Sequence, residues 1–378
     1  MSRNRLYQLA ELGQSVWLDY ISRSMLESGR LKKMIDQGLR GMTSNPSIFN
    51  NAIGQTTEYD DRIIKFKNAG KSIFEIYDEL TCADIQQACD EFRPVYEATN
   101  KLDGYVSLEI NPKLANKLEE QITEGVRLFR KVDRPNVMIK VPATGEGFAV
   151  IEELIAQAVN VNVTLIFSME QYRRTVRAYF QGLHRLSRKT DDLSHVRSVA
   201  SVFVSRIDAV VDKLIEERLT KEMDEKKKEK FKLLRGKAAV ANCRNIFEEF
   251  KNLFSGDEFA KLFDYKANEQ RVLWGSTSTK NPEYSDIKYV TELIVKPTVN
   301  TIPEKTLLAF MDHGQAKEAF NDEAADAREI IESLRSSGIN VDRICAQLLK
   351  DGVSAFEDAF EELMASVERK AAQLVLDK

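Results

Sequence analysis

NVMIKVPATGEGFAVIEELIAQAVNVNVTLIF, residues 136–167, contains a complete strand–helix–strand unit. Its two ends, NVMIKVP (136–142) and VNVNVTLIF (159–167), are short and rich in β-branched residues, and a helical pattern lies between them. Two short strands joined by a helix are typical of a parallel sheet in an α/β protein.

Short segments of this kind recur with helical patterns between them along the chain. They are QSVWLD (14–19), LRGMTSN (39–45), GYVSLEI (104–110), NVMIKVP (136–142), VNVNVTLIF (159–167), VRSVASVFV (196–204), RVLWGST (271–277) and VKPTVNT (295–301). Eight parallel strands alternating with helices can close into a barrel that leaves no sheet edge. A single (β/α)8 TIM barrel therefore explains a chain of 378 residues better than two open sheets do.

We expect residues 1–320 to form the barrel domain and residues 321–378 to form a C-terminal helical extension packed on it. Within 112–130, one apolar stripe with three- and four-residue steps is expected to lie on the sheet: Leu114, Leu118, Ile122, Val126 and Phe129. A second stripe predicts a C-terminal helix on the barrel or over its mouth: Phe356, Phe360, Leu363, Val367, Ala371 and Leu374.

The composition excludes several classes of protein. Hydrophobic residues make up 43% of the chain and charged residues 30%, as in ordinary soluble globular proteins. Lys and Arg (55) nearly balance Asp and Glu (59), so there is no global positive field to collect nucleic acid or anionic lipid. There is neither a long apolar stretch nor an export signal, so no membrane segment is expected.

The cysteines and histidines argue against a metal centre. The four cysteines include no Cys-x-x-Cys pair, and the three histidines have no spacing that would place two imidazoles on one metal. Neither a zinc site nor a disulfide framework is indicated, which fits a reducing compartment. We expect a cytoplasmic protein that uses no metal and no cofactor.

Lys140 is the most informative residue of the fourth predicted strand. Val137, Ile139 and Val141 share one parity and should pack against helices, so Met138 and Lys140 should point into the barrel. Burial disfavours a charged ammonium group and so favours the free amine that attacks a carbonyl carbon. The alternative is a structural lysine held in a salt bridge.

Polar residues on neighbouring strands are expected to face the same interior. Glu109 has the inward parity of the third strand, and Asn160, Asn162 and Thr164 have that of the fifth. Further polar side chains lie at strand ends or on inward positions of other strands: Asp19, Asn45 and Ser201. Buried polar groups are costly without partners, so this set indicates a polyhydroxylated substrate. For the last three residues, a turn or a helix cap is an equal alternative.

Two cations follow late strands. Arg206 comes just after VFVS, and Lys280 follows WGSTST. A phosphate could be clamped at such positions between a side chain and backbone N–H groups at the start of a helix. A plain surface cation is the alternative for each.

Eight separated segments resemble the transaldolase family, in order and over nearly all of the first 320 residues. They are SVWLDYISR, GMTSNPSIF, VSLEINP, MIKVPATGEG, NVNVTLIFS, VASVFVSRID, STSTKNP and TVNTIPE. The resemblance implies a class I, metal-free (β/α)8 barrel, in which the lysine on the fourth strand, here Lys140, forms a Schiff base with sugar phosphates.

The resemblance also implies roles for the other polar residues. Asp19 would be the acid/base at the cleaved bond, and Glu109 with Thr164 would hold the water used in imine formation and hydrolysis. The substrate-binding residues would be Asn45, Asn162, Ser201, Phe203, Arg206, Ser276 and Lys280, with Arg206 binding phosphate.

The expected reaction transfers a dihydroxyacetone unit from sedoheptulose 7-phosphate to glyceraldehyde 3-phosphate, in the pentose phosphate pathway. A class I lyase of the fructose-6-phosphate aldolase type is the nearest alternative. Phe203 argues for transfer, because resembling aldolases carry tyrosine there. A non-catalytic sugar-phosphate binding protein is the alternative of a different class. We expect a monomer or homodimer with small-molecule substrates, no nucleic-acid partner and no membrane partner.

Overall fold

The computed structural model describes residues 4–320 and 324–376. Eight parallel strands close into a barrel in chain order, so the predicted (β/α)8 fold is confirmed. Each predicted strand segment contains or overlaps one of them. They are β1 (Gln14–Asp19), β2 (Gly41–Thr43), β3 (Tyr105–Glu109), β4 (Val137–Pro142), β5 (Val161–Ile166), β6 (Ser198–Phe203), β7 (Arg271–Gly275) and β8 (Thr298–Ile302).

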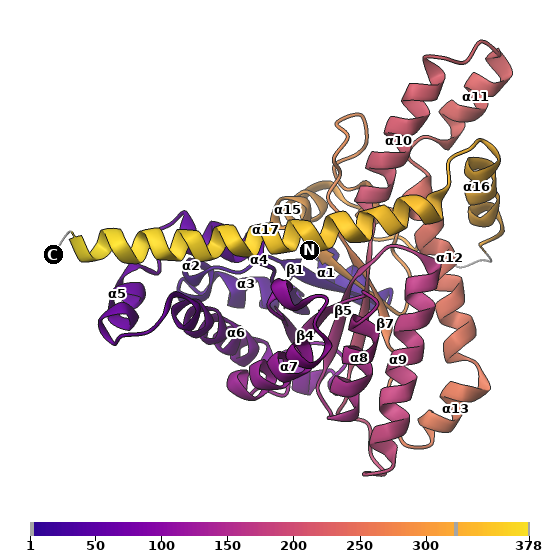
Figure 1. Ribbon diagram of the computed structural model, residues 1–378. Coiled ribbons are helices and arrows are strands. Elements are labelled where there is room, and N and C mark those ends of the chain that lie inside the picture. Colours follow the sequence, from indigo (N-terminus) through magenta and orange to yellow (C-terminus); the bar gives the residue numbers. More distant parts are fainter. Residues whose placement is uncertain (1–3, 321–323, 377–378) are drawn as a thin grey trace.

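Helices surround the barrel and lie across one end of it (Figure 1). Those of the first half are α1 (Arg5–Glu11), α2 (Arg23–Glu27), α3 (Arg30–Asp36), α4 (Pro46–Phe49), η1 (Asn50–Gly54), α5 (Asp60–Asn68), α6 (Ile73–Ala98), η2 (Pro112–Leu114), α7 (Leu118–Val132) and α8 (Gly147–Ala156). Those of the second half are α9 (Met169–Ser187), α10 (Ser205–Leu219), α11 (Glu225–Leu234), α12 (Ala238–Phe254), α13 (Asp257–Phe263), α14 (Lys288–Thr291), α15 (Glu304–His313), α16 (Ala325–Ser336) and α17 (Val341–Leu376).

The barrel interior has an apolar layer above a charged floor. The apolar cluster comprises Trp17, Tyr96, Tyr105, Met138, Val199, Leu273 and Val299. Gly41 makes room for it, because a Cβ atom there would lie 2.7 Å from the indole ring of Trp17. At the floor, Arg271 Nη2 lies 2.9 Å from Asp103 Oδ1, and both side chains bond the Ser15 hydroxyl. Polar chemistry is therefore confined to the floor and to the opposite, open end.

The outward residues of β4 pack as their parity predicts. Val137, Ile139 and Val141 belong to the large hydrophobic core between the strands and the helices, whereas Met138 belongs to the interior cluster. This alternation fixes the direction of Lys140, which shares the parity of Met138.

The predicted stripe within 112–130 packs against the hydrophobic core, and an adjacent row of α7 residues is buried more deeply. The helix α7 starts at Leu118, and its fully buried residues are Gln121, Gly125, Leu128 and Val132. The predicted residues of the stripe are only partly buried. The buried residues lie beside the stripe on the helix surface, so both rows belong to the side of α7 that faces the barrel. Gly125 also lies at the closest contact with Leu154 of α8, 2.9 Å from where a Cβ would sit.

The long helix α17 runs across the molecule in Figure 1. Its predicted stripe faces the core: Phe360, Leu363, Val367 and Ala371 are buried, while Phe356 and Leu374 are partly buried against them. The predicted domain boundary between 320 and 321 adjoins residues 321–323, which lie outside the described residues, so this division stays a prediction.

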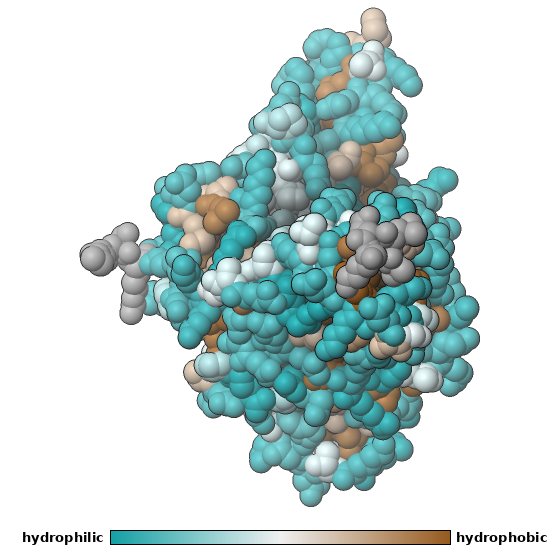
Figure 2. All heavy atoms as spheres, turned by 90° about the vertical axis from the view of Figure 1, so that its left-hand side faces the viewer, coloured by the Kyte–Doolittle hydropathy of each residue, from teal (hydrophilic) through white to brown (hydrophobic). Residues whose placement is uncertain are grey.

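The outer surface agrees with the charge content of the sequence. Figure 2 shows a face that is mostly hydrophilic, with small separate hydrophobic patches. Among the helices in the described ranges, none combines the length and apolar character that a membrane crossing requires.

Candidate active site

A pocket of about 180 Å³ lies at the C-terminal ends of the strands. Nine predicted site residues line it: Asp19, Asn45, Lys140, Thr164, Ser201, Phe203, Arg206, Ser276 and Lys280. Glu109 and Asn162 lie outside its lining, directly next to residues that form it. Residues from six strands or strand–helix connections thus meet at the face where ligands of this fold bind.

Lys140 is buried in the wall of this pocket, with 5% of its surface exposed. The pairing of β3, β4 and β5 places Glu109, Lys140 and Asn162 side by side at one height. Lys140 Nζ donates to Glu109 Oε2 at 3.1 Å and to the Ser44 carbonyl at 3.0 Å. The salt bridge considered as an alternative for this lysine is therefore present, and it lies inside the pocket region.

Two carboxyl groups have environments that favour their protonated forms. Burial raises the pKa of Glu109, and the charge of Asp19 raises it further, whereas Lys140 opposes the shift. Burial also raises the pKa of Asp19, against the lowering effects of Lys140 and of a hydrogen bond from Thr43. Both groups consequently take up a proton at a higher pH than an exposed carboxylate does.

Thr43 orients Asp19, and Thr301 contacts Thr43; the sequence analysis missed both threonines. The Thr43 hydroxyl donates to Asp19 Oδ1 at 2.7 Å and lies 2.7 Å from the Thr301 hydroxyl. Both threonines line the pocket and have the inward parity of their strands, as do Trp17 and Val299 below them. Strand alternation could therefore have identified them.

Asn162 lies beneath the pocket and is fully buried. Its amide Nδ2 donates to Ser107 Oγ at 3.0 Å, and its Oδ1 accepts from Ser201 Oγ at 2.6 Å. Asn162 therefore fixes the Ser201 hydroxyl, and Ser201 is the member of the pair that reaches the pocket.

Asn45 caps a helix and also lines the pocket. Its side-chain oxygen accepts from the backbone N–H of Ile48 at 3.0 Å and so caps the short helix α4. The same residue lines the pocket. The cap fixes the side chain in place at the pocket wall.

Thr164 presents a buried hydroxyl to the pocket. Its Oγ1 has no hydrogen-bond partner among the residues that the structure describes. The next residue, Leu165, has a φ of 60°, and the pairing of β5 with β6 shifts register between Val163 and Ile166. This bulge changes the direction of the strand at the pocket.

Arg206 and Lys280 meet at one side of the pocket. Arg206 is the second residue of α10, and its guanidinium carbon lies 5.6 Å from the centre of the Phe203 ring. Burial lowers the pKa of Arg206, and the charge of Asp351 on α17 opposes this effect. Ser276 has a φ of 54°. Its Oγ lies 3.1 Å from Ser205 Oγ, and this contact joins the loop after β7 to the start of α10. Lys280 is exposed at the rim.

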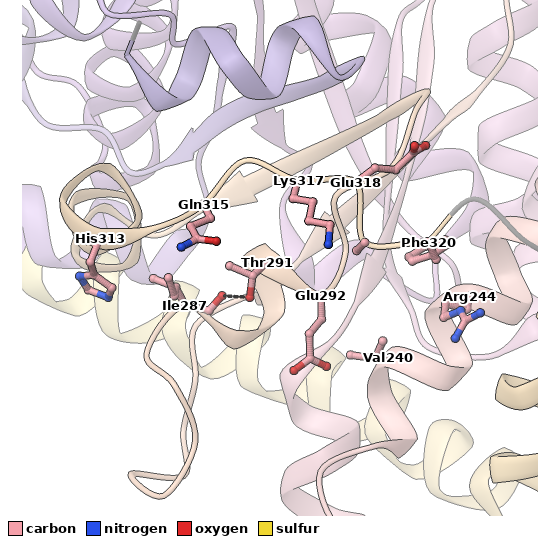
Figure 3. A pocket seen from close by; sticks show the side chains of 11 residues that line it. Val240, Arg244, Ile287, Thr291, Glu292, His313, Gln315, Lys317, Glu318 and Phe320 are labelled. Atoms are coloured by element: carbon pink, nitrogen blue, oxygen red, sulfur yellow. Dashed lines mark hydrogen bonds between the residues drawn. The ribbon is translucent and has the colours of Figure 1, made fainter. Parts of the chain in front are cut away.

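A larger cavity of about 620 Å³ lies elsewhere, between α12, α14 and residues 313–320. Figure 3 shows His313 and Arg244 at opposite ends of it. His313 is half exposed and pairs with Asp286 and Asp312, and Arg244 pairs with Asp326. No predicted site residue lines this cavity, so the barrel mouth remains the candidate site.

Phe356 lines the pocket, although it was expected only as part of the apolar stripe of a C-terminal helix. It belongs to α17, and Lys140 Nζ lies 5.8 Å from the centre of its ring. Its spacing identifies a helix face, but periodicity carries no information on which part of the barrel that face covers.

Comparisons with known proteins agree with this geometry. The family model described as Transaldolase/Fructose-6-phosphate aldolase matches residues 16–367. A transaldolase of Trichodesmium erythraeum is 44% identical over 377 residues, covering 99% of both chains. A protein named Transaldolase 2 from a Nostoc species is 42% identical over 99% of both chains, and a transaldolase of Saccharopolyspora erythraea is 41% identical over 98% of this chain and 99% of its own. With a matching family model and relatives that align along the whole length, the chain belongs to the transaldolase/fructose-6-phosphate aldolase family.

Proposed function

We propose that this protein is a transaldolase that moves a dihydroxyacetone unit between sugar phosphates through a Schiff base on Lys140. The single observation that carries the proposal is the position of Lys140 Nζ, buried at the barrel mouth with Glu109 Oε2 at 3.1 Å and Asp19 in the same pocket. The family match supports the same reaction class.

Imine formation needs a neutral amine. Glu109, whose pKa is raised by burial, can accept the proton that leaves the lysine ammonium group. The Lys140 amine then attacks the C2 ketone of the donor, and the C2 oxygen leaves as water when the iminium forms. We assign the holding of this water, here and again in hydrolysis, to Glu109 and to Thr164, whose hydroxyl lines the pocket and has no hydrogen-bond partner among the described residues.

Bond cleavage follows from the electron demand of the iminium. Asp19 removes the proton from the C4 hydroxyl, the C3–C4 bond breaks, and its electron pair moves towards the iminium nitrogen. An aldose phosphate leaves, and a three-carbon enamine remains on Lys140. The enamine carbon attacks the acceptor aldehyde, whose oxygen takes the proton back from Asp19, and hydrolysis releases the new ketose phosphate.

Substrate binding divides between the two sides of the pocket. Asn45 and Ser201 can bind sugar hydroxyls, and Asn162 acts by holding the Ser201 hydroxyl. Arg206, Ser276 and Lys280 form the cationic side that suits a phosphate group. Phe203 lies between these sides, under the guanidinium of Arg206. The donor and acceptor are proposed to be sedoheptulose 7-phosphate and glyceraldehyde 3-phosphate, which give fructose 6-phosphate and erythrose 4-phosphate.

Borohydride trapping tests the proposal directly. Reduction in the presence of fructose 6-phosphate should leave a stable three-carbon adduct, and peptide mapping should place it on Lys140. An unmodified Lys140 would exclude this nucleophile. A coupled assay with and without an aldehyde acceptor then separates the alternatives: a transaldolase requires the acceptor, a lyase of the fructose-6-phosphate aldolase type releases free dihydroxyacetone, and a binding protein forms no imine.

We also propose that the protein works in the cytoplasm, as a monomer or homodimer and without a nucleic-acid partner. The near balance of 55 basic and 59 acidic residues supports the last point. Size-exclusion chromatography with light scattering would determine the oligomeric state.

A further inference from the structure

The helix α17 places an aromatic side chain over the reactive lysine. Phe356 lines the main pocket together with Lys140, Asp19 and Thr164. It also lines a small neighbouring cavity that contains Glu109, Leu165 and Pro142. Its ring centre lies 5.8 Å from Lys140 Nζ. Phe356 is therefore the part of α17 that borders both the lysine and its carboxylate partner.

The height of Phe356 above the barrel is fixed one helical turn earlier. A Cβ atom on Gly352 would lie 3.0 Å from Leu165 Cδ2 and 3.7 Å from Arg206 Nη1. Leu165 itself is in the bulge of β5, at a φ of 60°. The missing side chain of Gly352 lets α17 approach this bulge closely, which lowers Phe356 onto the pocket.

The part of α17 that follows Phe356 also packs against other helices. One turn later, the buried Phe360 packs edge-on against Tyr77, with ring centres 5.4 Å apart. Further along, Lys370 Nζ lies 2.8 Å from Asp60 Oδ1 on α5. Contacts on both sides hold the helix, so the position of the Phe356 ring does not depend on its own packing alone.

The position of Phe356 matters because the enamine on Lys140 can react in two ways. In the productive cycle the enamine attacks an aldehyde. In the competing reaction its C3 takes a proton, water adds to C2 of the resulting iminium, and the C2–N bond breaks. Overall one water is consumed, dihydroxyacetone is released and the amine is regenerated. The two reactions diverge where C3 takes either the aldehyde or a proton, so access of water to the adduct as a proton source sets the ratio of loss to transfer.

We propose that Phe356 is a positioning residue that covers the Lys140 adduct on the side facing α17, excludes water there and stabilises the iminium charge with its aromatic face. A cation over a desolvated aromatic ring gains interaction energy that an aliphatic side chain does not offer. The inference rests on the proposed Schiff-base function, and it assigns part of the preference for transfer to the C-terminal helix.

The test uses the full chain with Phe356→Ala, Phe356→Leu and, as a matched control on the same helix, Phe360→Leu. Phe360 contacts Tyr77 and lies outside the pocket lining, so its substitution loosens the docking of α17 without uncovering the lysine directly. The measured quantity is the ratio of free dihydroxyacetone released to fructose 6-phosphate carbons transferred to erythrose 4-phosphate. Intact-mass analysis after borohydride reduction reports the trapped adduct.

We expect Phe356→Ala to raise the ratio about tenfold and Phe356→Leu, which keeps an apolar group without an aromatic face, to raise it about threefold. Phe360→Leu should stay within about twofold of the wild type. If the alanine variant does not fold, the leucine variant decides. Unchanged ratios in the folded Phe356 variants, or an equal rise in Phe360→Leu, would overturn the proposal. Failure of the Schiff-base function itself is seen separately, as the absence of an adduct on the wild-type lysine.

Discussion

Two buried ion pairs lie inside the same barrel, one at each end, and their differences show how the fold separates stability from chemistry. At the floor, Arg271 pairs with Asp103; at the mouth, Lys140 pairs with Glu109. The side chains are equally buried, with 8% and 7% exposed at the floor and 6% and 7% at the mouth. Burial alone therefore does not distinguish them.

The two pairs differ in how completely their hydrogen bonds are used. The Arg271 guanidinium also bonds Ser15 Oγ and the Leu102 carbonyl, and Ser15 in turn bonds Asp103, so the floor is a closed network. Lys140 has one further acceptor, the Ser44 carbonyl, and borders an open pocket. An arginine keeps its proton, whereas a lysine can lose one. The pair at the floor is therefore enclosed by further hydrogen bonds, whereas the pair at the mouth borders space that a ligand can enter.

Lys140→Met should have the largest effect on activity. Without the amine no imine can form, so turnover should fall by roughly 10⁴-fold or more. The fold should persist, because methionine has a similar volume and Glu109, with its raised pKa, can become neutral by taking a proton. Steady-state kinetics and circular dichroism check both points. Activity near that of the wild type would place the nucleophile elsewhere.

Arg271→Met should show the opposite pattern. It leaves Asp103 buried without its cation, which should lower the free energy of unfolding by about 3–5 kcal/mol. The folded fraction should retain its kcat, because the apolar layer separates the floor from the pocket. Denaturant unfolding and kinetics at low temperature measure the two quantities. If Lys140→Met lowers the free energy of unfolding as much as Arg271→Met does, the two ion pairs do not differ in their contribution to stability.

Arg206→Ala extends the comparison to a second guanidinium group, which we propose binds the substrate phosphate. Removing it should lower kcat/KM by about 100-fold for phosphorylated donors and much less for unphosphorylated ones, since a charged hydrogen-bonded contact to the phosphate is lost. The exposed Lys280, changed to alanine, is the control and should cost only about fivefold. Equal losses for both donor types would make Arg206 structural.

Thr43→Val should have the smallest effect, visible mainly as a change in pH dependence. Asp19 must be ionised to take the C4 proton, so activity falls as the pH drops through its raised pKa. The Thr43 hydrogen bond lowers that pKa, and its loss should move the acid limb of kcat/KM upward by about 0.5–1 pH unit. Thr301→Val, which touches Thr43 and makes no bond to Asp19, is the control. If the acid limb does not move in Thr43→Val, it reports the ionisation of a group other than Asp19.

Local patterns predict this barrel well because each strand alternates between two environments. The parity of NVMIKVP places Lys140 inside, and the register of β3 and β4 then puts Glu109 beside it, as the sequence indicates. The apolar stripe of α7 packs against the core as expected, but apolar spacing gave no sign that Gln121 and Gly125 are buried more deeply. Contacts between segments far apart in the sequence are harder to predict. The Ser44 carbonyl accepts a hydrogen bond from Lys140, and Phe356 reaches the pocket from a distant helix. Neither contact leaves a periodic signal.

The order of these parts along the chain has a consequence for biosynthesis. Every strand precedes residue 303, whereas the ring over Lys140 belongs to residue 356. Chains fold from the N-terminus as they leave the ribosome, so the barrel can close while its cover is still being translated. A nascent chain then passes through a stage in which the Lys140 amine is already in place but not yet covered by Phe356, and α17 docks last.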